Sequence, residues 1–153
     1  MEKSVGRLVS ILYRKNQIYL NVVLKPLNLT AAELPVFTYL FEHNGVSQEE
    51  LSSYLVIDKA STARVVQSLL EKGFLRKEKN LTDRRANKVF LTDLAYDQKE
   101  KIIKRLQQWT DFLAEGLEEE SVNTMFTVLD QMVKKVENAD IKDIWRSHEW
   151  NKH

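Results

Sequence analysis

The sequence predicts a mainly α-helical protein with one small β-hairpin, and three observations support this fold class. Apolar residues recur every three or four positions along most of the 153-residue chain, which is the period of an amphipathic helix. Only residues 75–91 change to the pattern of short extended strands. Four Gly and two Pro are too few turn residues for a sandwich or barrel with many hairpins. With 43% hydrophobic residues, the chain can still form a core.

The first two helices are expected on either side of a short connection, residues 25–29. Residues 5–24 carry a stripe of apolar side chains at helical spacing. Thr30-Ala31-Ala32-Glu33 has the form of a capping box, which predicts a second helix to about His43. Pro35 conflicts with a start at Thr30, because it removes an amide donor past the first turn. The helix therefore begins a few residues later or carries a local distortion.

Two capped helices joined by about three residues follow. Ser47-Gln48-Glu49-Glu50 is a second capping box and predicts a short helix over residues 51–55. Asp58 is a good N-cap for a helix over residues 59–72, which Gly73 ends. This arrangement is typical of a helix-turn-helix.

A β-hairpin is expected next. Residues 75–79 and 88–91 are short extended runs, and residues 80–87 form a long, polar, basic tip between them.

The last part of the chain is helical in pattern. Thr92 caps a helix over residues 93–114, and Ser121 caps another, whose apolar residues up to Val136 alternate steps of three and four like a coiled-coil seam. The tail after Ala139 contains two tryptophans and is expected to dock on something.

The net charge of +1 hides an uneven distribution. Residues 56–92 hold nine Lys and Arg against four Asp and Glu, residues 1–55 balance to zero, and residues 93–153 sum to −4. A basic segment is expected where a chain faces a polyanion, although surface asymmetry of this size also arises by chance.

The helix over residues 59–72 has two unlike sides on a wheel of about 100° per residue. The side expected to face inward carries small and apolar residues, Ala60, Ala63, Val66 and Leu70. The opposite side is polar and cationic, with Ser61, Arg64, Ser68 and Lys72, and with Lys59 and Thr62 near the helix start. Such a face fits a DNA major groove. A plain amphipathic surface helix is the alternative.

The hairpin tip places Arg84 and Arg85 beside Asp83. Arginine on a thin, protruding β-ribbon can enter a minor groove, and a neighbouring carboxylate can hold its direction. A solvated charge cluster is the alternative.

Three segments together resemble the multiple-antibiotic-resistance regulator (MarR) family of winged helix-turn-helix proteins. They are residues 57–66 (Ile-Asp-Lys-Ala-Ser-Thr-Ala-Arg-Val-Val), residues 69–73 (Leu-Leu-Glu-Lys-Gly) and residues 83–92 (Asp-Arg-Arg-Ala-Asn-Lys-Val-Phe-Leu-Thr). The last segment matches the family's Asp-x-Arg wing tip and its hydrophobic-x-Leu-Thr return strand. Helix order and length are similar over essentially the whole chain.

The resemblance implies a winged helix-turn-helix DNA-binding lobe over residues 30–92 and a helical dimerisation region over residues 1–29 and 93–153. It implies a homodimer that lays one helix in a major groove and the wing in the adjacent minor groove of a pseudo-palindromic operator. Repression released by a small phenolic or anionic effector is the usual mode. The apolar stripes at residues 5–24 and 121–136 agree with a dimer. An intramolecular bundle is the alternative.

Carried over residue by residue, the resemblance assigns DNA-binding roles. Ser61, Thr62 and Arg64 would contact the groove, with Ser68 on the same face. Arg85 would be the wing arginine, oriented by Asp83, and Arg84 a backbone or groove contact. The expected phosphate contacts are Lys59 and Lys88, with Ser47 and Gln48 at a helix N-terminus.

Other classes of protein are disfavoured. The chain has no Cys, which excludes disulfides, thiolate zinc sites and the peroxide-sensing mode of some relatives. The three His lack metal-ligand spacing, and no catalytic set is recognisable, so no enzyme, cofactor or metal is expected. No membrane span or signal-like start is visible, which favours a soluble cytoplasmic protein.

Two questions stay open at this point. The aromatic residues of the helices line either the core or an effector cleft; they are Tyr13, Tyr19, Phe37, Phe41 and Trp109. Pro35 lies near the place where relatives form that cleft, so its shape does not carry over. A helical protein–protein interaction module without DNA binding is the alternative function.

Overall fold

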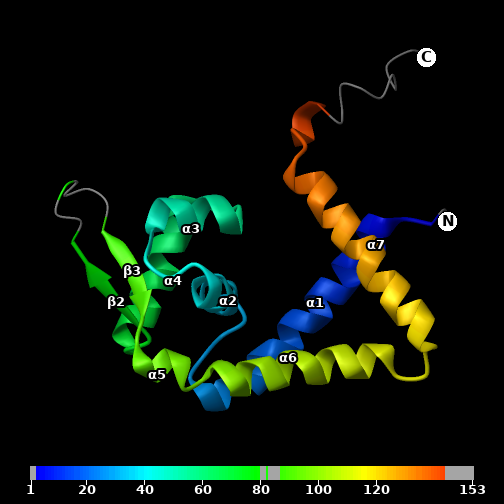
Figure 1. The fold of residues 1–153 in the computed structure, drawn as a ribbon, viewed down its shortest axis with the longest axis horizontal. Helices are drawn as coiled ribbons and strands as arrows, with labels where there is room; N and C mark the ends of the chain where they lie inside the picture. The colour runs from blue at the N-terminus through cyan, green and yellow to red at the C-terminus, as the bar shows by residue number, and fades with distance from the viewer. Residues whose placement is uncertain (1–2, 80–81, 83–86, 144–153) are drawn as a thin grey trace. The chain divides into compact units, whose positions relative to one another are not determined.

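The computed structural model describes residues 3–79, 82 and 87–143. The chain forms two compact units, residues 1–110 and 111–153, and the boundary falls within helix α6 (Lys99–Ala114). The first unit is mainly helical and contains one small antiparallel sheet, which confirms the predicted fold class (Figure 1). The division into lobes at residues 30 and 92 stays a prediction.

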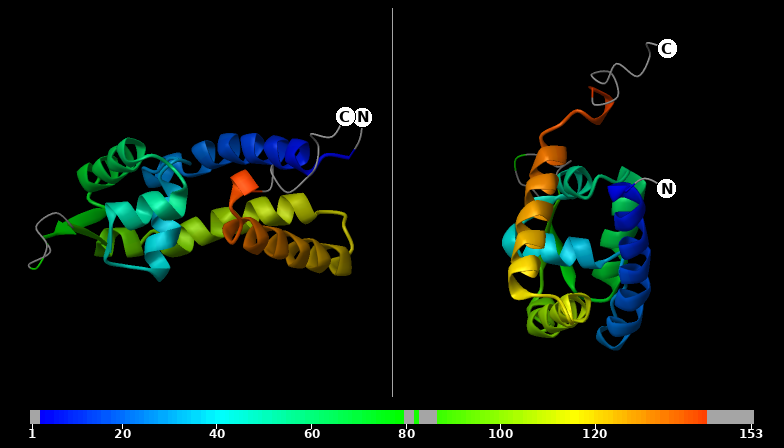
Figure 2. Two further views of the ribbon diagram at one scale, coloured as in Figure 1. Left: turned by 90° about the horizontal axis from the view of Figure 1, so that it is seen from above. Right: turned by 90° about the vertical axis from the view of Figure 1, so that its right-hand side faces the viewer.

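Helix α1 (Val5–Val23) and the short 3-10 helix η1 (Lys25–Leu27) come first. Leu20 and Leu24 are buried on the inner side of α1. The Tyr19 hydroxyl donates a hydrogen bond to the Arg105 carbonyl at 2.8 Å, and its ring stacks on Trp109 with centroids 5.0 Å apart. These contacts hold α1 beside the first part of α6 (Figure 2).

Helix α2 (Leu34–Glu42) begins four residues after Thr30, as the position of Pro35 requires. Pro35 lies in the first turn, where its missing N–H has no partner to lose. Only half of the predicted capping box forms: the Glu33 carboxylate accepts the Thr30 N–H at 2.9 Å, but the helix has no side-chain N-cap.

The second capping box is confirmed. Helix α3 (Gln48–Leu55) starts where Ser47 Oγ accepts the Glu50 N–H at 3.1 Å and Glu50 accepts the Ser47 N–H at 2.6 Å. Helix α4 (Lys59–Glu71) is capped by Asp58, as predicted. Between them Val56 has a φ of 54° and is 88% exposed, so a β-branched residue holds the left-handed position of the turn.

The sheet has three strands in the order β1-β3-β2, all antiparallel. Strands β2 (Leu75–Glu78) and β3 (Lys88–Leu91) are the predicted hairpin and lie beside α4 in Figure 1. Strand β1 (Val46–Ser47) was not predicted, because two residues carry no alternating pattern. A Cβ on Gly45 would lie 2.5 Å from the Phe90 ring, so this glycine lets β1 approach β3.

Two predicted helix bounds are wrong. The helix expected over residues 93–114 is interrupted at Asp97 and Gln98, which separate α5 (Asp93–Tyr96) from α6. Helix α7 (Glu119–Glu137) begins before Ser121, with Glu118 at the N-cap and no side-chain cap. The two tryptophans of the tail lie outside the described residues.

The buried core of the first unit joins α1, α2, α3, α4, the sheet and α6. Its fully buried members include Phe37, Leu40, Leu51, Val66 and Ile102. A second set of apolar residues is exposed: on α1, Val5, Leu8, Val9, Leu12, Tyr13, Ile18 and Val22, and on α7, Met125, Phe126, Val128, Leu129, Met132, Val133 and Val136. These stripes match the surfaces that the sequence assigns to dimerisation.

Candidate nucleic-acid interface

Helix α4 is rotated by about one residue relative to the predicted orientation. Thr62, Val66 and Leu69 are buried, and this 4–3 spacing defines the inner side. Ala60 and Ala63, predicted to face inward, are exposed. The outward side of α4 is therefore the row of exposed residues Ala60, Ala63, Arg64, Gln67 and Glu71.

Thr62 is not available for the DNA contact predicted for it. Its side chain is 0% exposed, and its hydroxyl accepts a hydrogen bond from Ser52 Oγ at 2.7 Å. The same hydroxyl donates to the Asp58 carbonyl at 3.1 Å. Its role is to satisfy buried polar groups where α3 packs on α4, so this prediction is corrected.

A chain of hydrogen bonds leads from the helix cap to the guanidinium of Arg64. Ser61 donates from its N–H to Asp58 Oδ1 at 2.8 Å and from its hydroxyl to Asp58 Oδ2 at 2.7 Å. Arg64 Nη2 in turn donates to Ser61 Oγ at 2.8 Å. The two bonds from Ser61 lower the pKa of the Asp58 carboxyl. Ser61 thus helps orient Arg64, and Arg64 itself is exposed.

An open hollow of about 440 Å³ lies on the outward side of α4. It is lined by side chains from the start of α3, from α4 and from β2: Gln48, Ala63, Arg64, Gln67, Ser68, Glu71 and Lys77. The sequence analysis named Gln48, Arg64 and Ser68 but missed Gln67 and Lys77. Gln67 follows Ala63 by one turn on the same side, a spacing that the wheel shows once the helix orientation is known.

The other described candidates for phosphate contacts are Lys59, Ser47 and Lys88, which do not line this hollow. Lys59 Nζ forms an exposed ion pair with Glu49 at 3.0 Å, and such a pair is weak enough to exchange for a phosphate. The Ser47 N–H donates to the Glu50 carboxylate and Ser47 Oγ accepts the Glu50 N–H, so Ser47 serves the helix cap. The hydrogen bonds from Ser47 lower the pKa of the Glu50 carboxyl. Lys88 is exposed at the start of β3.

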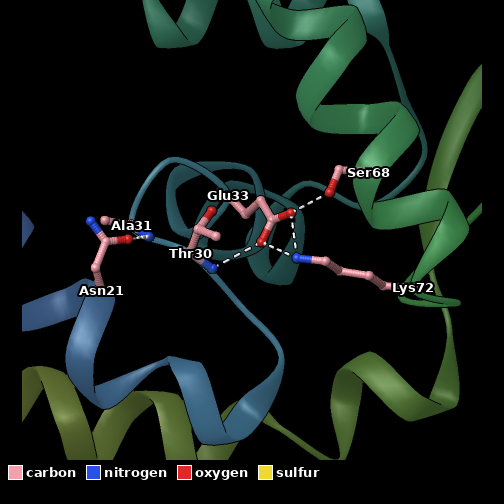
Figure 3. A network of polar contacts seen from close by, with 6 residues as sticks. All are labelled: Asn21, Thr30, Ala31, Glu33, Ser68 and Lys72. Atoms are coloured by element: carbon pink, nitrogen blue, oxygen red, sulfur yellow. Dashed lines mark hydrogen bonds and ion pairs between the residues drawn. The ribbon is translucent and has the colours of Figure 1, made fainter.

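Ser68 and Lys72 are bound to a buried carboxylate, which the sequence analysis did not foresee (Figure 3). Ser68 Oγ donates to Glu33 Oε1 at 2.6 Å, and Lys72 Nζ lies 2.7 and 2.8 Å from the two carboxylate oxygens. Burial raises the pKa of the Glu33 carboxyl, but the hydrogen bonds from Lys72, Ser68 and the Thr30 N–H outweigh it and leave the pKa below its ordinary value. Glu33 is therefore an anion.

The predicted wing-tip residues Asp83, Arg84 and Arg85 lie outside the described residues. Two hydrogen bonds hold the base of the wing: Thr92 Oγ1 donates to the Gly73 carbonyl at 2.7 Å, and the Thr92 N–H donates to the Phe74 carbonyl at 3.0 Å. On β2, Arg76 forms an ion pair with Glu78 and lies over the Phe90 ring, 4.6 Å from its centroid.

Two further observations concern other kinds of site. Within the described ranges, no group of His, Asp and Glu is placed to hold a metal ion, and no helix is long and apolar enough to cross a membrane. Of the aromatic residues proposed for an effector cleft, Phe37 is fully buried in the core and contacts Phe41 and Phe74 edge to face.

Comparison with known proteins gives consistent results. The family model for the MarR family matches residues 29–86. The HTH-type transcriptional regulator BilQ of Clostridium symbiosum is 30% identical over 99 residues, which span 65% of this chain and 69% of that protein.

Solved structures extend the likeness. A MarR transcriptional regulator from Methanosarcina mazei superposes with a TM-score of 0.83 and 30% identity, over 86% of this chain and 94% of that one. A protein from Listeria monocytogenes, solved in complex with a 26mer DNA, shares the fold with a TM-score of 0.79, at 21% identity, over 88% and 90% of the two chains. The chain described here belongs to the MarR family of transcriptional regulators.

Proposed function

We propose that this chain is a dimeric transcriptional regulator that binds operator DNA with α4 in the major groove and the β2–β3 wing in the adjacent minor groove. The observation that carries the proposal is the outward side of α4, where Arg64 and Gln67 are exposed beside two alanines. Gln67 Nε2 donates a hydrogen bond to Glu71 Oε1 at 2.9 Å on the same helix, which an adenine would have to replace. Lys77 and Gln48 flank the same hollow from the sheet and from α3.

The chemistry of this row matches the donor and acceptor pattern of the major groove. Arg64 is the side chain type that binds guanine in bidentate fashion, and Gln67 the type that binds adenine. The methyl groups of Ala60 and Ala63 suit contact with the thymine methyl. The proposal therefore replaces Thr62 with Gln67 as a base contact and adds Lys77 to the phosphate contacts.

Three predicted DNA contacts take other roles in the proposal: Ser47 caps α3, Ser61 orients Arg64 and Ser68 binds Glu33. The other sequence-based roles are kept. Lys59, Lys88 and the N-terminus of α3 at Gln48 would bind phosphates, and Ser61 would orient Arg64. Arg84 and Arg85 would reach the minor groove, with Asp83 orienting Arg85. Two chains would associate through the exposed stripes of α1 and α7 on a pseudo-palindromic operator, and the protein would act in the cytoplasm.

Selection from a randomised duplex library with the full-length chain tests the proposal. We expect one enriched pseudo-palindromic sequence, and a logarithmic affinity that falls linearly with the logarithm of salt concentration. A chain that enriches no sequence and shows no salt dependence contradicts the proposal and favours the interaction module.

Substitution of Arg64 refines this test. Arg64→Ala should cost about 1–3 kcal/mol on the selected duplex and relax the preference at one base position. Lys77→Ala should weaken all duplexes alike and lower the salt slope by about one. Lys101→Ala, an exposed lysine on α6, removes the same charge outside this surface and serves as the control. Equal losses in all three variants would leave only a general effect of charge.

Repression and its release by a small phenolic or anionic ligand complete the proposal. Both are supported by family membership. Titration of the protein–duplex complex with 4-hydroxybenzoate, a small phenolic anion, should lower the affinity for DNA. An unchanged affinity contradicts this part for that class of ligand.

A further inference from the structure

We propose that Glu33 is the positioning residue that sets the direction in which α4 presents Arg64 and Gln67, and thereby the half-site spacing that the dimer accepts. The inference rests on the proposed function and goes beyond it, because Glu33 itself does not face DNA. Its side chain is only 4% exposed and lies in the turn between α1 and α2.

The Glu33 carboxylate holds α4 at two points and its own turn at a third. Ser68 lies on α4 and Lys72 is the C-cap residue four positions later, and both donate to this carboxylate. The Thr30 N–H donates to Oε2 from the opposite side at 2.9 Å. Figure 3 shows the carboxylate between the turn and the C-terminal half of α4.

Because the ion pair is buried, moving α4 away from Glu33 costs free energy. The Lys72 side chain is 21% exposed, so both charges of the pair are largely removed from water. A buried charge that loses its partner is strongly destabilising, so α4 cannot turn away from Glu33 at low cost. A shift of α4 by one residue would rotate the two donors by about 100° and move them by about 1.5 Å, which breaks the bonds.

The same geometry fixes the surface offered to DNA. Arg64 precedes Ser68 by about one turn, or about 6 Å along the helix axis, and Gln67 immediately precedes Ser68 in the sequence. Together with the buried side of α4, the bonds from Ser68 and Lys72 to the carboxylate therefore set the rotation of the row that would read bases.

The turn that carries Glu33 is also bound to α1. The Ala31 N–H donates to Asn21 Oδ1 at 3.0 Å, on the far side of the turn in Figure 3. Because α1 carries an exposed apolar stripe assigned to the dimer, Asn21 and Glu33 link the dimerisation helix to the recognition helix. In a two-fold dimer, the angle of α4 relative to α1 sets the separation of the two recognition helices, and hence the spacing of half-sites near about 10 base pairs.

Glu33→Gln in the full-length chain tests the inference, with Glu42→Gln as the matched control. Glu42 lies exposed on α2, so its replacement changes the net charge equally. The probes are the duplex selected by the wild-type chain, versions with the half-sites one or two base pairs nearer or farther, and a single half-site. Circular dichroism and light scattering at the assay temperature establish that each variant is folded and dimeric.

We expect Glu33→Gln to weaken binding to the selected duplex by about fivefold or more and to flatten the dependence on half-site spacing. Binding to the single half-site should change less, because one recognition helix can still adjust. The control should keep the wild-type spacing preference. A purely structural role would lower the unfolding midpoint but leave the spacing preference of the folded dimer intact.

A folded Glu33→Gln dimer with the wild-type spacing preference overturns the inference. If that variant does not fold, Ser68→Ala decides in its place, because it removes one donor and leaves the ion pair; an unchanged spacing preference again overturns the inference. A wild-type chain that selects no duplex contradicts the proposed function itself, which separates the two failures.

Discussion

Thr30–Glu33 and Ser47–Glu50 have the same sequence pattern, yet they form different structures. In both, the glutamate accepts the backbone N–H of the residue three positions earlier. At Ser47 the helix starts at once, and both bonds of the capping box form at the surface. At Thr30 the helix starts later, and the glutamate turns inward to bind Ser68 and Lys72. The local pattern therefore predicts the contact between the glutamate and the backbone N–H. Where the helix begins, and which other side chains the glutamate binds, depend on residues outside the pattern.

The largest difference between the two segments is expected in the free energy of unfolding that is lost when each glutamate is removed. Glu33→Ala leaves Lys72 without its buried partner and should lower the free energy of unfolding by about 3 kcal/mol. Glu50→Ala loses only part of a surface cap and should cost about 1 kcal/mol. Urea denaturation at one protein concentration measures both. Equal losses would show that burial of Glu33 adds nothing to its cap-like role.

Both carboxylates should also contribute to the pH dependence of stability, each by no more than the free energy lost when its side chain is removed. Both carboxyls have a lowered pKa in the folded chain, so the stability linked to them is complete above the pKa of unfolded Glu and is lost as the pH falls through the lower folded value. Glu33→Gln should flatten the curve of urea midpoint against pH between neutral and acidic pH. We expect Glu50→Gln to flatten it as well; a curve that either substitution leaves unchanged contradicts the lowered pKa of that carboxyl.

The smallest effects are expected from the two cap hydroxyls. Ser47→Ala removes the acceptor of the Glu50 N–H and should cost about 1 kcal/mol. Thr30→Ala should change stability by less than about 0.5 kcal/mol, because α2 is capped by no side chain. Thermal unfolding of the two variants provides the comparison, and a larger loss for Thr30 would mean that its hydroxyl has a partner.

The sequence predicts most elements between residues 30 and 92 because their signals are local. The Ser47 box, the Asp58 cap and the strands beside Gly73 and Thr92 all depend on neighbours within a few residues, and all are found. What it does not predict depends on distant partners. From the sequence alone Thr62 is expected at the surface, because nothing near it indicates the hydrogen bond from Ser52, ten residues earlier.

The candidate site follows the same division. Arg64 was found from composition and spacing, whereas Gln67 and Lys77 became visible only when the rotation of α4 and the register of β2 were known. Glu33 was assigned to a cap because nothing near it in sequence indicates Ser68 or Lys72. The roles of Asp83, Arg84 and Arg85 stay predictions.

The exposed apolar side chains of α1 and α7 imply that the stability of this protein depends on its concentration. If Leu8, Leu12, Leu129 and Val133 are covered only by a second chain, folding and association are one equilibrium. Each tenfold dilution then reduces the apparent stability by about 1.4 kcal/mol. In a cell that keeps only a few copies, the number of molecules would itself govern how much regulator is competent to occupy its operator.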